Sequence, residues 1–293
     1  MVQEAKSTFL LEHPPEGSGF MHGLKKFFGL QNPDLHNPVV LMRSALYGPG
    51  LVNMALDFAS RAPDVADLGC GSGWFSLEVA RRNPQARIRA IDKDPEALEW
   101  ARSYAARRRS LKGHIEYVPA DLAELEFDPR SLDVAVAFFV LGSLEKPLEL
   151  LERLLEALRP GGLFIYYDAT EPPARNLEKL SRLMFRRARF RGKMSDAWSE
   201  RRKLEDLYLH DLARGHRPTA APPEADVYAF LARHLDVLHH SRQRAFVDLK
   251  VKDMTAGDAF YELPWWKLLD DMLVRAGYLE GATRFLVARK RGM

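Results

Sequence analysis

The residues best suited to chemistry stand in a short glycine-rich segment, which reads Asp67-Leu-Gly-Cys-Gly-Ser-Gly73. An apolar stretch at Val65–Leu68 predicts a strand that leads into it, and a helix is expected just after it, over Trp74–Arg82. Glycine lets the backbone turn sharply and lets a ligand approach the main chain closely. The helix would offer free N–H groups and a partial positive charge to an anionic group. The segment therefore predicts a ligand-binding turn.

Two kinds of ligand are candidates for this turn. Nicotinamide dinucleotides favour the pattern G-x-G-x-x-G. Here the glycines follow G-x-G-x-G, and Trp74 occupies the position of the last glycine in the dinucleotide pattern. The carboxylate of Asp67 would repel a pyrophosphate and attract an ammonium group. The turn therefore favours a ligand that carries an amine and a carboxylate over one that carries two phosphates.

Two further acidic residues follow expected strands. Asp92 ends a strand expected over Arg87–Ile91 and comes about 20 residues after the glycines, where a carboxylate can accept hydrogen bonds from both hydroxyls of a ribose. Asp121 follows a strand expected over His114–Pro119. Because the carboxyl ends of parallel strands meet at one edge of a sheet, both acids are expected beside the glycine turn.

Each of these residues also has a structural interpretation. Asp67 could cap the turn, and Asp121 could be an ordinary turn residue. Asp92 could cap the next helix, although Asp94 is better placed for that role. Cys70 is expected to be a small packing residue rather than a nucleophile, because no catalytic partner stands near it in the sequence.

Together with Leu158-Arg-Pro-Gly-Gly162, which precedes a fifth expected strand, these elements resemble the class I S-adenosylmethionine-dependent methyltransferases over residues 63–170. The resemblance implies S-adenosylmethionine as cofactor and an in-line methyl transfer, in which alignment and exclusion of water supply most of the rate. It assigns contacts with the methionine part of the cofactor to Asp67, Gly69, Cys70, Gly71 and Gly73, with Phe138 and Phe139 beneath that part. It assigns contacts with the ribose to Asp92 and Lys93, and contacts with the adenine to Asp121 and the Leu122 N–H. Tyr47 would reach the cofactor carboxylate if the N-terminal helices fold over the site, although packing is the more common role of such a tyrosine.

The methyl acceptor is expected at the carboxyl ends of the fourth and fifth strands, as in other open α/β sheets. Many members of the family carry a histidine pair where this chain has Gly142-Ser143, so one ready base is missing here. Asp168 is the nearest titratable group in the core, and His22 lies in the N-terminal segment that often closes over the site in the family. These two residues are the candidates for a catalytic base. Asp168 could equally cap the segment that follows it.

Strands that alternate with helices predict an α/β, Rossmann-like fold, with a mostly parallel twisted sheet and helices on both of its faces. The chain is expected to divide into four segments: a helical N-terminal cap at 1–62, the cofactor-binding core at 63–170, a helical basic insertion at 171–241, and final strands and a helix at 242–293. The two helical segments would form a cap that shapes the acceptor pocket.

The later part of the chain carries weaker signals. Residues 174–240 read as helix without strand signals. Ala245–Val251 and Arg284–Ala288 are expected to be strands, and Trp265–Ala276 is expected to be a helix that closes on Gly277.

Composition excludes several classes of protein. The chain has 293 residues, a formal net charge of +3 and one cysteine, so it can form no internal disulfide and no multi-cysteine zinc site, and no metal is expected. Its start lacks the apolar core of a signal peptide, and its longest apolar run is too short to span a bilayer. The sequence thus predicts a cytoplasmic protein that does not contact the membrane. It does not reveal an oligomeric state.

The insertion leaves the partner open. Over Arg182–Lys203 arginines alternate with Phe185, Phe190 and Trp198, a pattern that could bind RNA through phosphates and stacked bases. The same pattern could form an amphipathic lid, which is the favoured interpretation. The preferred hypothesis is therefore O- or N-methylation of a small-molecule acceptor, and an arginine-rich lid would suit an acidic one. An RNA methyltransferase and a non-catalytic S-adenosylmethionine-binding protein remain as alternatives.

Overall fold

A single mixed β-sheet organises the chain in a computed structural model, which describes residues 49–106, 114–170, 176, 179, 224–245 and 256–292. Within these residues, seven strands form one sheet in the order β3-β2-β1-β4-β5-β7-β6. The strands are β1 (Asp64–Leu68), β2 (Arg87–Asp92), β3 (His114–Pro119), β4 (Leu132–Phe138), β5 (Leu158–Ala169), β6 (Leu235–Gln243) and β7 (Thr283–Lys290). Strands β1 to β5 are parallel, and β7 is antiparallel to both β5 and β6.

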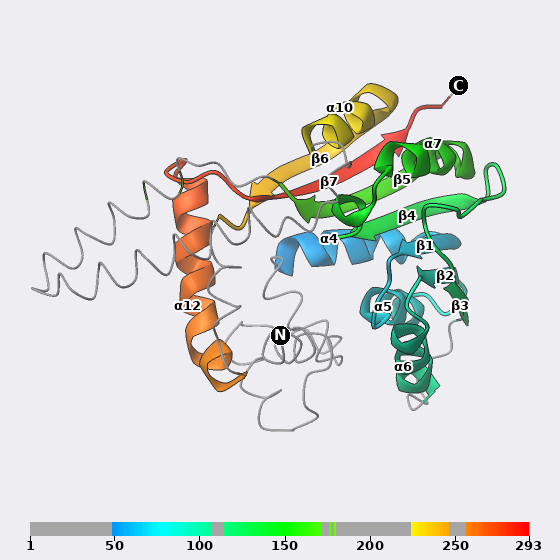
Figure 1. Cartoon of the computed structure of the whole chain (residues 1–293), viewed down its shortest axis with the longest axis horizontal. Coiled ribbons are helices and arrows are strands. Elements are labelled where there is room, and N and C mark those ends of the chain that lie inside the picture. The colour runs from blue at the N-terminus through cyan, green and yellow to red at the C-terminus, as the bar shows by residue number, and fades with distance from the viewer. Residues whose placement is uncertain are drawn as a thin grey trace, which may run out of the picture.

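Helices cover both faces of the sheet (Figure 1). They are α4 (Pro49–Ala59), α5 (Trp74–Arg82), α6 (Pro95–Ala106), the short 3-10 turn η1 (Leu141–Ser143), α7 (Pro147–Ala157), α10 (Glu224–His234) and α12 (Ala256–Arg275). Helices α4 and α5 pack on one face, where their apolar residues form one core cluster with the sheet. Helices α7 and α10 pack on the other face in a second cluster. Apolar residues at helical spacing in α7, such as Leu150, Leu151 and Leu154, are buried in that second cluster, as expected of an amphipathic helix.

The predicted fold class is confirmed: the sheet is mostly parallel, and strands alternate with helices through the first five strands. The helix α5 and the strand β3 have the predicted bounds. The continuous apolar run at Leu132–Val140 predicts the fourth strand, but β4 ends two residues earlier, since Phe139 adopts a φ of 58°, which breaks an extended strand.

The prediction that residues 174–240 contain no strand is wrong, because β6 begins at Leu235. This strand lies at the edge of the sheet and pairs only with β7, so most of its residues are partly exposed. Its polar stretch around His239 and His240 lacks the alternation that marks a half-buried strand in sequence. Most of the strand expected over Ala245–Val251, namely residues 246–251, lies outside the described residues.

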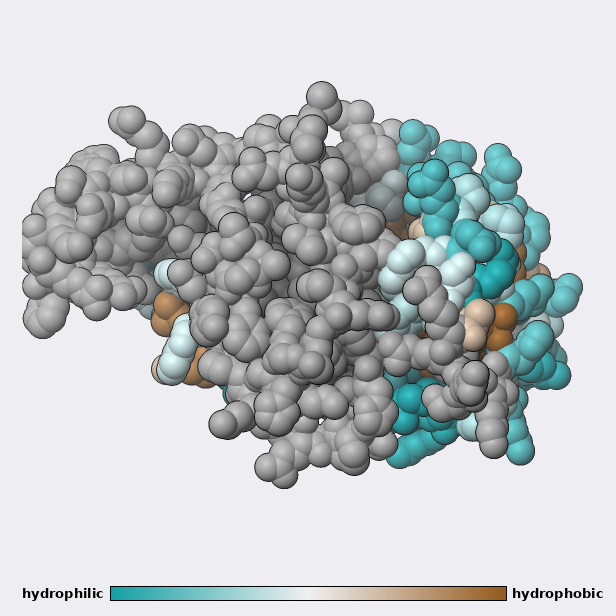
Figure 2. Space-filling view, turned by 90° about the horizontal axis from the view of Figure 1, so that it is seen from below, coloured by the Kyte–Doolittle hydropathy of each residue, from teal (hydrophilic) through white to brown (hydrophobic). Residues whose placement is uncertain are grey.

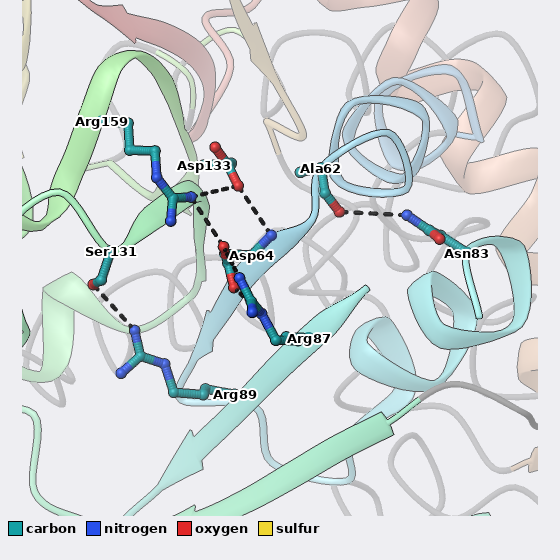
Figure 3. Close-up of polar contacts among 8 residues, drawn as sticks. All are labelled: Ala62, Asp64, Asn83, Arg87, Arg89, Ser131, Asp133 and Arg159. Carbon is teal, nitrogen blue, oxygen red and sulfur yellow. Dashed lines mark hydrogen bonds and ion pairs between the residues drawn. The ribbon is translucent and has the colours of Figure 1, made fainter. Parts of the chain in front are cut away.

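A polar network joins the strands at the amino end of the sheet (Figure 3). The guanidinium of Arg159 donates to Asp133 Oδ2 at 2.6 Å, and the Asp64 backbone N–H donates to the same oxygen at 3.0 Å. Arg87 forms a fork with the two carboxylate oxygens of Asp64, at 2.6 Å each. These hydrogen bonds hold the pKa of Asp64 below its ordinary value, Arg87 contributing most. Because these contacts link β1, β2, β4 and β5, they hold these strands in register at their amino ends, opposite the glycine turn.

In Figure 2 the part of the surface formed by described residues is largely hydrophilic, with small hydrophobic areas. No helix within the described residues is both long enough and apolar enough to cross a membrane.

Candidate cofactor and acceptor site

The glycine turn between β1 and α5 has the left-handed backbone that only glycine adopts readily. Gly69, Gly71 and Gly73 have φ values of 62°, 50° and 68°. The turn is held against β2: the Cys70 N–H donates to the carbonyl of Ile91 at 2.9 Å, and the Gly71 N–H donates to a carboxylate oxygen of Asp92 at 2.8 Å. The predicted turn and the predicted acid on the second strand are therefore in direct contact.

The turn leaves room for a ligand on one side. A Cβ on Gly69 would lie 2.3 Å from Cγ2 of Val140, whereas a Cβ on Gly71 would meet nothing within 4 Å. Between Gly71 and Gly73, the Ser72 hydroxyl is buried, and no described residue offers it a hydrogen-bond partner. A buried hydroxyl without a partner is uncommon in a native protein. The open space beside Gly71 and the Ser72 hydroxyl without a partner among the described residues thus fit a bound polar ligand.

Asp67 is the buried acid of the site, with an exposed fraction of 4%. Its Oδ2 accepts hydrogen bonds from the backbone N–H and the hydroxyl of Ser76, at 3.2 and 2.6 Å. Oδ2 therefore caps the start of α5, as expected if Asp67 has a capping role. Among the described residues no donor reaches the other oxygen, Oδ1. Burial raises the pKa of Asp67 to about 7, although the Ser76 hydrogen bonds oppose the shift. A ligand cation near Oδ1 would stabilise the ionised form.

The raised pKa of Asp67 makes the stability of the ligand-free protein depend on pH. The folded state holds a proton on this group up to a pH of about 7, whereas the unfolded chain releases it near 3.8. Since the folded state binds more protons in this window, the free energy of unfolding falls as pH rises through it. Asp67→Asn removes the buried charge, so we expect it to exceed the wild type in stability at pH 8 by on the order of 3 kcal/mol, and to match it near pH 4.

Urea unfolding of both ligand-free proteins at pH 4 and pH 8 tests this difference. An equal difference in stability at the two pH values would show that Asp67 does not carry a buried charge in the folded protein.

The chain after β3 is bonded to the end of β2, because the N–H of Ala120, which precedes Asp121, donates to the backbone carbonyl of Asp92 at 3.0 Å. The Asp92 carboxylate also accepts from the Asp94 N–H at 3.0 Å. Asp94 itself caps α6 through the N–H groups of its first turn, as the sequence predicts. Asp121 is exposed and accepts from the Ala123 N–H at 2.9 Å, an arrangement typical of an Asx turn.

The neighbours of these acids differ in exposure. Lys93, next to Asp92, is exposed, and the side chain of Leu122 is buried. The thiol of Cys70 is buried too, and burial raises its pKa, so it remains protonated and fits a packing role.

An aromatic cluster lies at the carboxyl end of β4. Phe138 stacks on Trp74 with ring centroids 5.9 Å apart, and the edge of Phe75 meets it at 5.3 Å. Phe139 contacts Tyr167 of β5 at 5.0 Å, and its backbone N–H donates to the Tyr167 carbonyl at 2.7 Å. Both phenylalanines of the predicted pair therefore contact Tyr167 of β5, and Phe138 also packs against Trp74 and Phe75 of α5.

Asp168, the candidate base, is buried at the end of β5, with an exposed fraction of 4%. Its Oδ2 accepts from the Gly142 N–H at 2.8 Å, and its Oδ1 accepts from the Ala169 N–H at 2.7 Å. A Cβ on Gly142 would lie 3.2 Å from Oδ1, a tight contact, so glycine suits this position beside the carboxylate. The carboxylate therefore joins β5 to η1. The other candidate base, His22, lies outside the described residues, as do Tyr47 and the Arg182–Lys203 segment.

A group of arginines near the same edge was missed in the sequence. Arg242 donates to the Thr170 hydroxyl at 3.0 Å, and the guanidinium of Arg284 lies 3.1 Å from His240 Nε2. Arg244 places its guanidinium over the ring of Phe139, 5.3 Å from the centroid. Because β6 was not predicted, nothing in the sequence aligned these side chains with β5. Within the described residues, no three His, Cys, Asp or Glu side chains lie close enough together to hold a metal ion.

A glycine turn at the carboxyl end of the first strand of a parallel sheet, with an acid from the second strand touching it, defines a nucleoside-binding Rossmann-like protein. Residues 65–162 match the family model described as a methyltransferase domain. The chain is 30% identical over 220 residues to a trans-aconitate 2-methyltransferase from Streptomyces coelicolor, and the match covers 70% of this chain and 68% of that protein. The chain belongs to the class I S-adenosylmethionine-dependent methyltransferases, and S-adenosylmethionine is its cofactor.

Other relatives match a shorter part of the chain. A malonyl-[acyl-carrier protein] O-methyltransferase from Halalkalibacterium halodurans is 30% identical over 105 residues, which are 35% of this chain and 37% of that protein. The chain thus spans little more than a third of that relative. A solved structure of an S-adenosylmethionine-dependent methyltransferase from Methanosarcina mazei has a TM-score of 0.50, at 18% identity, and covers 82% of this chain and 98% of that one. At this identity, the likeness shows the fold alone.

Proposed function

We propose that the protein transfers a methyl group from S-adenosylmethionine to a carboxylate oxygen of a small acidic molecule. The similarity to a protein named for methylation of trans-aconitate, over 70% of the chain, carries this proposal. The second relative is named as an O-methyltransferase. Arg242 of β6 and Arg284 of β7 lie beside the carboxyl end of β5 and give the acceptor side a positive charge that suits an anion.

The cofactor would lie across the carboxyl ends of β1, β2 and β3. The backbone of Gly69, Gly71 and Gly73, with Cys70 between them, would approach the methionine part. Asp67 Oδ1 would accept from the ammonium group, and the Ser72 hydroxyl would donate to the carboxylate. Tyr47 of the N-terminal segment remains a proposed contact to that carboxylate.

The nucleoside would lie against the two adjacent acids. Asp92 would accept from the ribose hydroxyls, with Lys93 beside it. Asp121 would accept from the adenine amino group, and the Leu122 N–H would donate to the ring. The backbone hydrogen bond between Ala120 and Asp92 supports this pairing, because it fixes the distance between the ribose-binding and adenine-binding positions.

The chain's own residues have a limited chemical task in this reaction. S-adenosylmethionine supplies a methyl group that is already activated by its bond to a sulfonium. A carboxylate acceptor has already lost its proton at neutral pH, so no base is required. This agrees with the absence of a histidine pair at Gly142-Ser143 and with the two hydrogen bonds that occupy the oxygens of Asp168. We therefore assign Asp168 the role of positioning η1. His22 is the remaining candidate base for an acceptor that still carries its proton.

Incubation of the protein with methyl-labelled S-adenosylmethionine and a panel of acceptors tests this function. The panel would contain trans-aconitate, malonate, benzoate, a primary amine and total tRNA. We expect the label to appear in an acid as a methyl ester. Mild alkali should release this label as methanol, because methyl esters hydrolyse in alkali whereas methyl ethers and methylamines do not. Alkali-stable label on the amine, or label in the tRNA that falls steeply with salt, would support the alternative acceptors instead. Tight cofactor binding without label in any acceptor would point to a non-catalytic binding protein.

A further inference from the structure

Arg244 is the residue on the acceptor side whose position is most constrained. It follows β6 directly, is only 6% exposed and has a φ of 55°, in the left-handed region. A residue other than glycine rarely adopts this backbone, and a side chain held there costs of order 1–3 kcal/mol. Such residues persist where the surrounding structure fixes them, and they cluster at functional sites.

Neighbouring segments hold the backbone of Arg244 on both sides. The Ala282 N–H donates to the Arg244 carbonyl at 2.8 Å, and the Ala245 N–H donates to the buried carboxylate of Asp270 at 2.8 Å. Next to this contact, a Cβ on Gly281 would lie 2.4 Å from the backbone nitrogen of Gln243, so only glycine lets the two segments approach so closely. The unfavourable φ is therefore fixed by packing around β6, β7 and α12.

The side chain of Arg244 is directed to the carboxyl end of β4. Its guanidinium lies 5.3 Å from the centroid of the Phe139 ring, and Phe139 also has a left-handed φ, of 58°. These two residues therefore meet where the methyl acceptor is expected, after β4 and beside β5. A guanidinium over the face of an aromatic ring is attracted to it, and the N–H fork of the guanidinium matches the two oxygens of a carboxylate.

The charges around Arg244 favour an anion. Arg242 and Arg284 lie on the adjoining strands β6 and β7, with Arg242 bonded to Thr170, two residues after Asp168. Among the described residues, Asp168 accepts two backbone N–H groups, the buried Asp270 accepts the Ala245 N–H, and Glu280 lies 3.9 Å from Arg242. Burial lowers the pKa of His240, and the positive charges of Arg284 and Arg242 lower it further.

We infer that Arg244, whose guanidinium lies over the Phe139 ring, binds a carboxylate of the methyl acceptor and so determines the specificity of the enzyme for acids. This inference rests on the proposed function and adds the residue that recognises the substrate class. The carboxylate that Arg244 binds orients the acceptor. Arg244 is thus a specificity-determining residue, distinct from the groups that hold the cofactor.

Binding of acids to the protein loaded with S-adenosylhomocysteine tests the role of Arg244. The probes are propane-1,2,3-tricarboxylate, succinate and benzoate, each compared with its uncharged amide by calorimetry. The variants are Arg244→Met, Arg244→Lys and, as a matched control, Arg291→Met, which removes an exposed arginine that pairs with Asp236 at the opposite end of β6. Arg244→Lys keeps the charge and loses the fork, so it separates loss of recognition from loss of folding.

We expect at least one acid to bind the wild type at least tenfold more tightly than its amide. Arg244→Met should lower the affinity for that acid at least tenfold, and Arg244→Lys should lower it by an intermediate amount. Arg291→Met should bind the acid as tightly as the wild type does. All four proteins should bind S-adenosylhomocysteine equally. If Arg244→Met binds the acids as the wild type does, or if no acid binds a protein that takes up S-adenosylhomocysteine, the role of Arg244 is overturned while the methyltransferase stands. Failure of the wild type to take up S-adenosylhomocysteine would instead overturn the proposed function.

Discussion

Replacement of Gly69 by alanine is expected to destabilise the protein by roughly 2–5 kcal/mol, as the sum of a left-handed backbone and a steric overlap. The backbone has a φ of 62°, and the added Cβ would lie 2.3 Å from Cγ2 of Val140. Val140 belongs to the buried cluster beneath α7, so it has little freedom to move. Thermal or urea unfolding without ligand measures this loss.

Gly71→Ala is the matched comparison. Its φ of 50° carries the backbone cost, but the added Cβ would meet nothing within 4 Å. We expect a loss of stability of only about 1–2 kcal/mol, together with a larger loss of cofactor affinity, because the methyl group would enter the space that the ligand needs. If Gly69→Ala proves as stable as Gly71→Ala, the close contact with Val140 does not exist in solution. If Gly71→Ala binds S-adenosylhomocysteine like the wild type, the ligand does not lie on that side of the turn.

Asp92→Ala is expected to weaken the binding of S-adenosylhomocysteine by about 1–3 kcal/mol, through loss of charged hydrogen bonds to the ribose. This corresponds to roughly fivefold to 150-fold in the dissociation constant. Part of the loss would arise from the turn itself, because Asp92 also accepts from the Gly71 N–H. Isothermal titration calorimetry on the purified variant measures the change.

Asp94→Ala serves as the control for local disruption. It removes the cap of α6, two residues away, and leaves both contacts of the glycine turn with β2 in place. We expect it to cost about 1 kcal/mol of stability and to leave the affinity for S-adenosylhomocysteine unchanged. An Asp92→Ala protein that binds as tightly as the wild type would refute the assignment of Asp92 to the ribose.

The cofactor side of the fold was predictable because its signals are local. A strand, three glycines and a helix follow one another within 20 residues at Asp64–Arg82, and each glycine has the positive φ that its position requires. Asp92 could be placed beside the turn, which it contacts through the Gly71 N–H, because parallel strands end at one edge of the sheet.

The acceptor side was not predictable in the same way. The antiparallel pairing of β6 with β7 is a long-range contact, and the polar residues of β6 give no alternating pattern. The position of Arg244 against Phe139 joins residues more than 100 positions apart, which only the folded sheet brings together. Asp168 was expected in the core after the fifth strand and is buried there, but its hydrogen bond to Gly142 depends on the conformation of η1.

Titration of the purified chain with S-adenosylhomocysteine and, in a separate cell, with NADH tests most directly whether the glycine turn and its carboxylate select an amino-acid nucleoside. We expect saturable binding of S-adenosylhomocysteine that is weakened by Asp92→Ala, and no heat from NADH at the same concentrations. Saturable binding of NADH together with no binding of S-adenosylhomocysteine would contradict the account.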